Sequence, residues 1–94
     1  MSVTVTDRNK GELTVEGRLL AEVTSKGEGP KALNYSTLAV YRTEEARWLL
    51  KMERIRNGLA VEGWEVFRDR RELQDWLGFG SLPIRLYQAA GWPI

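Results

Sequence analysis

Apolar and polar residues alternate along the first two-thirds of the chain, which is the pattern of half-buried β-strands. Val3 and Val5 alternate with threonines before a turn-forming segment at residues 7–11. The alternation continues from Glu12 to Thr24, and Gly17 in its middle is expected at a bulge or bend. One face of this strand is predicted to carry Leu13, Val15, Leu19, Ala21 and Val23.

Residues 25–34 contain two glycines and a proline and are predicted to form a surface loop. Strands are expected from about Tyr35 to Arg42 and from Ala46 to Arg56, with a tight turn at Glu44-Glu45. A two-residue loop at that turn pairs Tyr41 with Trp48, Ala39 with Leu50 and Thr37 with Met52, a face expected to be core.

Asn57-Gly58 is the strongest hairpin signal in the chain. A two-residue loop without irregularity sets Leu50 opposite Glu65, which is a poor pair. A one-residue bulge at Gly63 places Trp64 opposite Met52 and Val66 opposite Leu50, so a bulge is expected there.

The last third of the chain has helical periodicity. Asp69 and Glu72 have the spacing of a capping box, and Gly78 is expected to end the helix that they begin. A second short helix is predicted from Ser81 to a stop at Gly91, with Pro83 in its first turn. The apolar stripes of the two helices are Leu73, Trp76 and Leu77, and Leu82, Leu86 and Ala90. The predicted fold is therefore α+β: an antiparallel β-meander of four or five strands followed by two short C-terminal helices packed on one sheet face, in a single domain of residues 1–94.

Five short blocks of this sequence stand out by their order and spacing: Gly17-Arg18-Leu19-Leu20-Ala21-Glu22, Tyr41-Arg42-Thr43, Trp48, Glu65-Val66-Phe67 and Glu72-Leu73. This order and spacing resembles the EXLDI-type small bacterial proteins, whose activity is unknown. The resemblance covers roughly residues 15–77. It implies an α+β fold and a regulatory or accessory context, and it supplies no active site.

Composition removes several classes of function. The chain has no Cys and no His, so disulfide frameworks, the usual zinc ligands and histidine-based catalytic triads are excluded. The net charge is +1, which gives no global electrostatic attraction to nucleic acid or anionic membrane. No apolar run approaches the roughly 18–20 residues of a membrane span, and the first residues lack the features of a signal peptide. We therefore expect a cytoplasmic protein, in which the sequon at Asn34 is a chance match.

The chemically interesting residues have simpler structural explanations. The carboxylates of Glu44-Glu45, Glu62 with Glu65, and Glu72 with Asp75 suit turns, a bulge and a helix, and nothing predicts a cleft between any pair. The chain has two Gly-x-Gly sequences, Gly27-Glu28-Gly29 and Gly78-Phe79-Gly80, and neither extends to a nucleotide-binding fingerprint. No catalytic residue, metal site or cofactor is therefore predicted.

The two strands joined at Glu44-Glu45 also have a face opposite the predicted core face. In the predicted register this opposite face carries apolar residues at its centre and cations beside them. An apolar patch with a charged rim is typical of a protein interface, although the C-terminal helices are an alternative cover for the same face. The candidate partner-binding residues are Leu38, Val40, Arg42, Arg47, Leu49 and Lys51.

The function predicted from these features is that of a small non-catalytic protein-binding module, regulatory or inhibitory, of the type encoded by phages and mobile elements. It acts on a larger partner or as a homodimer. One alternative is a single-stranded nucleic-acid-binding domain, in which cations alternate with an aromatic ring; its residues are Arg47, Trp48, Lys51, Arg54 and Arg56. A second alternative is a small enzyme that uses carboxylates.

Overall fold

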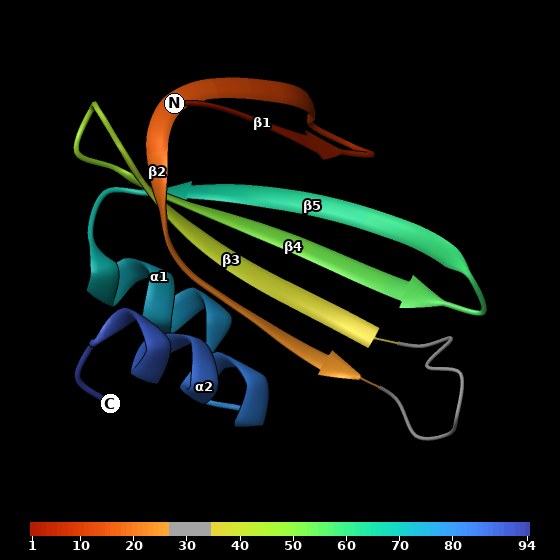
Figure 1. Ribbon diagram of the computed structural model, residues 1–94. Coiled ribbons are helices and arrows are strands. Elements are labelled where there is room, and N and C mark those ends of the chain that lie inside the picture. Colours follow the sequence, from red (N-terminus) through yellow and green to blue (C-terminus); the bar gives the residue numbers. More distant parts are fainter. Residues whose placement is uncertain (27–34) are drawn as a thin grey trace.

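The computed structural model describes residues 1–26 and 35–94, which form five strands and two helices (Figure 1). Most of the loop predicted at residues 25–34, with the sequon asparagine, lies outside the described residues; Ser25 and Lys26 continue a strand. The elements are β1 (Ser2–Asp7), β2 (Gly11–Lys26), β3 (Tyr35–Thr43), β4 (Trp48–Arg56), β5 (Leu59–Phe67), α1 (Arg70–Leu77) and α2 (Ser81–Ala90).

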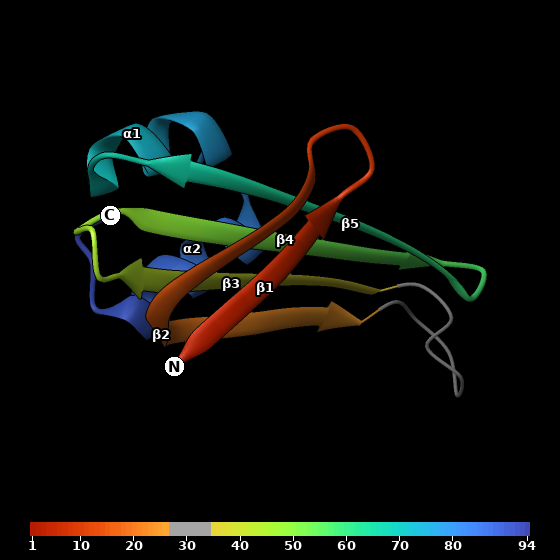
Figure 2. The same cartoon turned by 90° about the horizontal axis from the view of Figure 1, so that it is seen from above.

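The strands form an antiparallel meander in the order β1-β2-β3-β4-β5, and both helices lie on one face of it (Figure 1). The predicted α+β class and the meander followed by two helices are confirmed. The first half of β2 pairs with β1 and the second half with β3. Strand β2 bends between these halves, so that β1 and residues 11–16 cross the sheet on the face opposite the helices (Figure 2). We call this crossing unit the N-terminal hairpin.

The bend in β2 is made by Gly17 and by a bulge at Leu20, three residues later. Gly17 is buried, and a Cβ atom there would lie 2.8 Å from the carbonyl oxygen of Arg42. The bulge follows because Leu19 pairs with Tyr41 while Ala21 pairs with Val40, which leaves Leu20 without a partner position. One extra residue inverts the faces of all residues that follow it. The expectation that β2 keeps all its apolar residues on one face is therefore wrong.

Two cores result from this inversion. The larger core lies between the sheet and the helices, and it includes Ala21, Val23, Leu38, Val40, Leu50, Phe67, Leu73, Leu86 and Tyr87. The smaller core lies between the sheet and the N-terminal hairpin, and it joins Val3, Val5 and Leu49 with the half-buried Leu13, Val15, Tyr41 and Trp64.

The turn between β3 and β4 contains three residues, not the two that were predicted. Thr43 donates its backbone N–H to the carbonyl of Arg47 over 3.0 Å, and Ala46 donates to the carbonyl of Thr43. Ala46 adopts a left-handed conformation with φ of 61°, which the third position of such a turn requires. The register consequently shifts by one residue, and Leu49 faces Tyr41 while Leu50 faces Val40.

The turn between β4 and β5 is the predicted two-residue turn, with positive φ at both Asn57 and Gly58. The bulge expected at Gly63 does not occur, because Gly63 pairs with Met52 in an uninterrupted register. Leu50 therefore lies opposite Glu65, whose carboxylate forms an ion pair with Lys10. From sequence alone, the uninterrupted register looked poor because it sets the charged Glu65 opposite the apolar Leu50. The ion pair with Lys10 gives the Glu65 carboxylate a partner of opposite charge.

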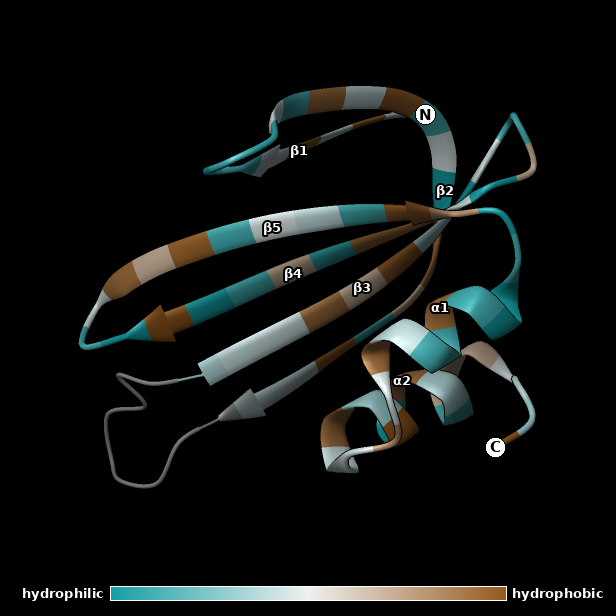
Figure 3. Ribbon diagram, turned by 180° about the vertical axis from the view of Figure 1, so that it is seen from behind, coloured by the Kyte–Doolittle hydropathy of each residue, from teal (hydrophilic) through white to brown (hydrophobic). Residues whose placement is uncertain are grey.

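Both helices have the predicted ends. The Asp69 carboxylate accepts the N–H of Glu72 at 2.8 Å, Gly78 follows α1, and Gly91 ends α2 in the left-handed conformation. Neither helix in the described parts of the chain has the length and apolarity of a membrane span. At about 12 Å for α1 and 15 Å for α2, the helices are shorter than the roughly 30 Å of a nine-residue strand. They cover only part of the sheet, as Figure 3 shows.

Candidate protein-interaction surface

The six residues predicted to bind a partner do not lie on one exposed face. Leu38 and Val40 are buried beneath the helices, and Leu49 is buried beneath the N-terminal hairpin. The cations are separated as well: Arg42 lies over the Trp48 ring at 4.3 Å, Arg47 directly follows the three-residue β3–β4 turn, and Lys51 is half-buried on the hairpin side. The predicted surface was wrong for two reasons. The three-residue turn shifts the register of β4 by one residue, which separates Leu49 from Leu38 and Val40. Both faces are also covered, one by the C-terminal helices, as the alternative prediction held, and the other by the N-terminal hairpin.

A different exposed surface lies where the helices end. Residues 53–62, the outer halves of β4 and β5 with their turn, project beyond α1 and α2 (Figures 1 and 3); we call them the β4–β5 arm. Leu59 is 74% exposed and Val61 56% exposed on this arm. Their cross-strand partners are Arg56 and Arg54, both exposed. The arm therefore presents apolar residues beside cations, the combination expected at an interface.

The outer edge of β5 adds unpaired backbone groups to this arm. Because Asn57-Gly58 closes a two-residue turn, Arg56 and Leu59 form a hydrogen-bonded pair, and such pairs recur at every second residue. The N–H and C=O groups of Ala60, Glu62, Trp64 and Val66 consequently point away from β4. In the described parts of the chain, no strand pairs with this edge.

The contacts of Trp64 support this assignment and show that part of the edge is closed. Its backbone N–H faces the Asp7 carboxylate and helps to lower the pKa of that group, and its carbonyl accepts a hydrogen bond from the Nζ of Lys10 at 2.8 Å. The N–H and C=O groups of Trp64 therefore point away from β4, as expected from the alternation of hydrogen-bonded and non-hydrogen-bonded pairs along β5. The turn of the N-terminal hairpin thus blocks the edge at Trp64, which is a common way to prevent unwanted strand pairing. In residues 1–26 and 35–94, no backbone hydrogen bond is made to the outward groups of Ala60 and Glu62, although the side chains of Thr6 and Arg8 border this segment.

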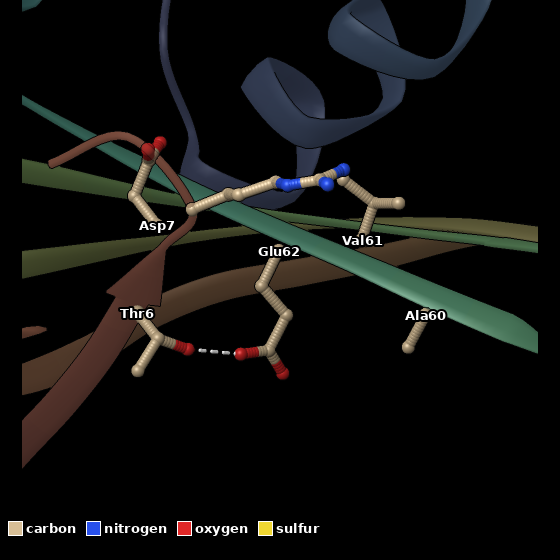
Figure 4. Close-up of a pocket in the computed structure, with 6 residues that line it drawn as sticks. Thr6, Asp7, Ala60, Val61 and Glu62 are labelled. Carbon is tan, nitrogen blue, oxygen red and sulfur yellow. Dashed lines mark hydrogen bonds between the residues drawn. The ribbon is translucent and has the colours of Figure 1, made fainter. Parts of the chain in front are cut away.

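A hollow of about 550 Å³ adjoins this uncovered segment, lined by Thr6, Asp7, Arg8, Ala60, Val61 and Glu62 (Figure 4). The Thr6 hydroxyl donates a hydrogen bond to the Glu62 carboxylate, which holds the pKa of Glu62 below its ordinary value. The Val61 side chain points to the side of β5 opposite to that of the Glu62 and Ala60 side chains (Figure 4). The hollow therefore offers room for a chain segment lying alongside β5.

The carboxylates of Asp7, Glu16 and Glu62 accept hydrogen bonds from neighbouring groups. Backbone N–H groups of Asn9 and Lys10 lower the pKa of Asp7, and a hydrogen bond from the Ser2 hydroxyl lowers that of Glu16. A general acid at neutral pH needs a raised pKa, so Asp7, Glu16 and Glu62 do not suit that role. Of the predicted pairs, Glu44 and Glu45 are exposed in a turn, while Glu62 and Glu65 point to opposite faces of β5.

A second hollow, of about 430 Å³, opens between the first half of β2 and the β3–β4 turn. Leu13, Val15 and Val66 form its apolar part, and the charged residues around it carry both signs. This mixture does not select one class of ligand. Across residues 1–26 and 35–94, no three Asp, Glu, Cys or His side chains lie close enough together to hold a metal ion.

The residues predicted to bind a single-stranded nucleic acid also lie on different faces of the sheet. Trp48 is half-buried, with its ring 5.0 Å from that of Trp92 and with Arg42 over it, so it is not a free platform for a base. Arg54 and Arg56 lie on the helix side of the β4–β5 arm, whereas Lys51 lies on the hairpin side. The proposed interleaving of cations and an aromatic ring on one surface is therefore absent.

No family model, no curated protein and no solved structure matches this chain. The resemblance to EXLDI-type proteins stays a prediction from the residues.

The candidate interaction surface contains three residues that were not among those predicted to bind a partner: Leu59, Ala60 and Val61. A signal for them was available in the lengths of the elements. Nine-residue strands outreach helices of eight and ten residues by about half their length. Apolar residues next to the Asn57-Gly58 turn therefore had no element to cover them.

Proposed function

We propose that this protein is a small non-catalytic protein-binding module, regulatory or inhibitory in effect, which takes up a strand of another chain along the free edge of β5. The observation that carries the proposal is the edge at Ala60 and Glu62, with which no strand of the described residues pairs, beside the exposed Leu59 and Val61. Addition of a strand to a sheet edge is a recurrent mode of recognition, in which backbone hydrogen bonds give affinity and side chains give specificity.

The closed and open parts of the edge support this mode. Asp7 and Lys10 block the edge at Trp64, so an added strand has a defined end. Natural sheets normally protect such edges with charges, bulges or short strands. An edge that is protected in one half and left open beside two exposed aliphatic residues is consistent with an interface.

Photo-cross-linking tests the proposal. A benzophenone amino acid is placed at Val61 and, as a matched control, at Leu19, which is apolar, 45% exposed and located at the bend of β2. We expect irradiation in cells that make the protein to give discrete protein adducts from position 61 and few from position 19. A second substitution, Ala60→Pro, removes an outward N–H and is expected to suppress the adducts.

Equal adduct patterns from the two positions would show that Val61 reports only random collisions. Adducts that persist in the Ala60→Pro background would show that the edge is not used. Either result would overturn the proposal.

A further inference from the structure

We propose that the strand taken up by β5 is the β5 strand of a second copy of this chain, antiparallel to the first, with the two-fold axis at Val61. This inference rests on the proposed function, because it names the occupant of the same edge. The register, the side chains and the length of the open edge each support a second copy as the occupant.

The register follows from the direction of the backbone groups. In an antiparallel pair, two residues that exchange hydrogen bonds must both point their N–H and C=O groups at the partner. On the uncovered edge these residues are Ala60 and Glu62. Setting Ala60 opposite the second copy's Glu62, and Glu62 opposite the second copy's Ala60, uses all of these groups and places the two Val61 residues face to face.

The neighbouring registers are poorer. Centring the pair on Ala60 sets Glu62 opposite Gly58, which lies in the turn, so one of the two hydrogen-bonding residues loses its partner. Centring it on Glu62 sets two carboxylates against each other and requires the groups of Trp64, which Asp7 and Lys10 already occupy.

The side chains suit the register centred on Val61. On the helix side, the two Val61 side chains meet at the axis, and Leu59 of each copy lies opposite Gly63, which has no side chain of its own. On the hairpin side, each Glu62 lies opposite Ala60 and not opposite its own equivalent. The apolar residues exposed in one copy are thus brought together, while direct pairing of like charges is avoided.

The length of the open edge also agrees. A second copy begins its β5 at Leu59, immediately after Asn57-Gly58, and in this register Leu59 reaches Gly63 of the first copy. The next residue, Trp64, is where the hairpin turn closes the edge. The strand that a second copy offers therefore ends where the acceptor edge ends. An interface built on five residues of each strand is smaller than the standard area of about 1,600 Å², so we expect a weak, reversible dimer.

Single cysteines test the register directly, because the chain contains no other Cys. In Val61→Cys the two thiols lie in a non-hydrogen-bonded pair with Cα atoms about 4.5 Å apart, within the range that a disulfide spans. In Leu59→Cys the two thiols are offset by four residues, about 13 Å along the strands. Leu59 is the more exposed of the two positions, so it controls for random collision.

We expect mild oxidation to produce disulfide-linked dimer at least about tenfold faster from Val61→Cys than from Leu59→Cys. Ala60→Pro added to Val61→Cys is expected to remove this advantage. Faster dimer formation from Leu59→Cys would overturn the register. Equal rates, together with a monomeric mass for the unmodified chain in sedimentation equilibrium up to about 1 mM, would overturn the second copy as the occupant.

These outcomes are separable from failure of the proposed function. If the chain is monomeric but the Val61 photo-probe captures a different protein in an edge-dependent manner, the edge binds a foreign strand and only the present inference falls. If neither assay shows edge-dependent pairing, both fall.

Discussion

Gly17 packs against the backbone of Arg42, whose carbonyl oxygen lies 2.8 Å from the position that a Cβ atom at residue 17 would occupy. The Cα of Thr43 lies 3.2 Å from the same position. Both obstacles are backbone atoms of a central strand, so they cannot move aside as a flexible side chain does. The close contact between the backbone of Gly17 and the backbone of Arg42 and Thr43 allows β2 to bend, and the bend places the N-terminal hairpin over the sheet.

Gly17→Ala is therefore expected to destabilise the protein by about 1–3 kcal/mol, the usual cost of overpacking. Gly63→Ala is the matched control, because its Cβ would meet only side-chain atoms of Asp7 and Met52, at 3.2 and 3.6 Å. Urea unfolding of both variants measures the difference. Equal losses would show that the approach at Gly17 does not constrain the bend.

The outward direction of the Ala60 backbone predicts different tolerances for proline at adjacent positions of β5. Ala60→Pro removes an N–H that makes no bond to β4 and should change the free energy of unfolding by less than about 0.5 kcal/mol in the monomer. Val61→Pro removes a ladder bond to Arg54 and should cost about 1–3 kcal/mol. Thermal or urea unfolding at low protein concentration distinguishes them, and the reverse order would refute the assigned hydrogen-bonding pattern.

The N-cap of α1 gives a third prediction. Asp69→Ala removes the acceptor of the Glu72 N–H and is expected to destabilise the protein by about 1 kcal/mol. Asp75→Ala, at an exposed position in the second half of the same helix, should be neutral or slightly stabilising, because a negative charge there opposes the helix dipole. Chemical unfolding compares the two; equal effects would mean that the cap contributes nothing beyond the loss of a charge.

Stability in acid should depend on Asp7. Hydrogen bonds from the Asn9 and Lys10 N–H groups lower its pKa in the folded protein below the ordinary value of 3.8. A lowered folded-state pKa gives a stabilisation that is complete above the unfolded-state pKa and is lost as the pH falls through the folded-state pKa. We therefore expect the stability advantage of the native chain over Asp7→Asn to be constant above about pH 5 and to shrink below about pH 4.

Urea midpoints of the native chain and Asp7→Asn, measured between about pH 2 and pH 7, test this dependence. The comparison with Asp7→Asn is needed because Glu16 and Glu62 also have lowered pKa values and contribute to acid sensitivity in both proteins. A difference that stays constant down to pH 2 would contradict the role of the Asp7 carboxylate.

Features that depend on nearby residues were predictable from the sequence. The period-two alternation predicted the strands, the spacing of Asp69 and Glu72 predicted the start of α1, and Gly78 and Gly91 predicted where the helices end. The Asn57-Gly58 turn was predictable for the same reason, since both residues adopt positive φ at low cost. These local signals were sufficient for the α+β class and the order of the elements.

Two single-residue irregularities depended on the tertiary structure, and they decided which face each side chain occupies. The unpaired Leu20 in β2 and the third residue of the β3–β4 turn, Ala46, each shift a register by one position. Because strand side chains alternate with period two, each shift exchanges the two faces. Leu38 and Leu49, predicted to share an exposed face, are consequently buried in different cores.

The exposure of the candidate interaction surface was decided in the same way. The sequence shows that Leu59 and Val61 follow a turn, but their exposure depends on how far the helices reach along the sheet. The open edge at Ala60 and the closed edge at Trp64 differ only because the bend at Gly17 brings Asp7 and Lys10 over β5. Local propensities determined the strands and helices of this protein; packing between residues distant in sequence determined which strand edge stays unpaired in the described part of the chain and which side chains stay exposed.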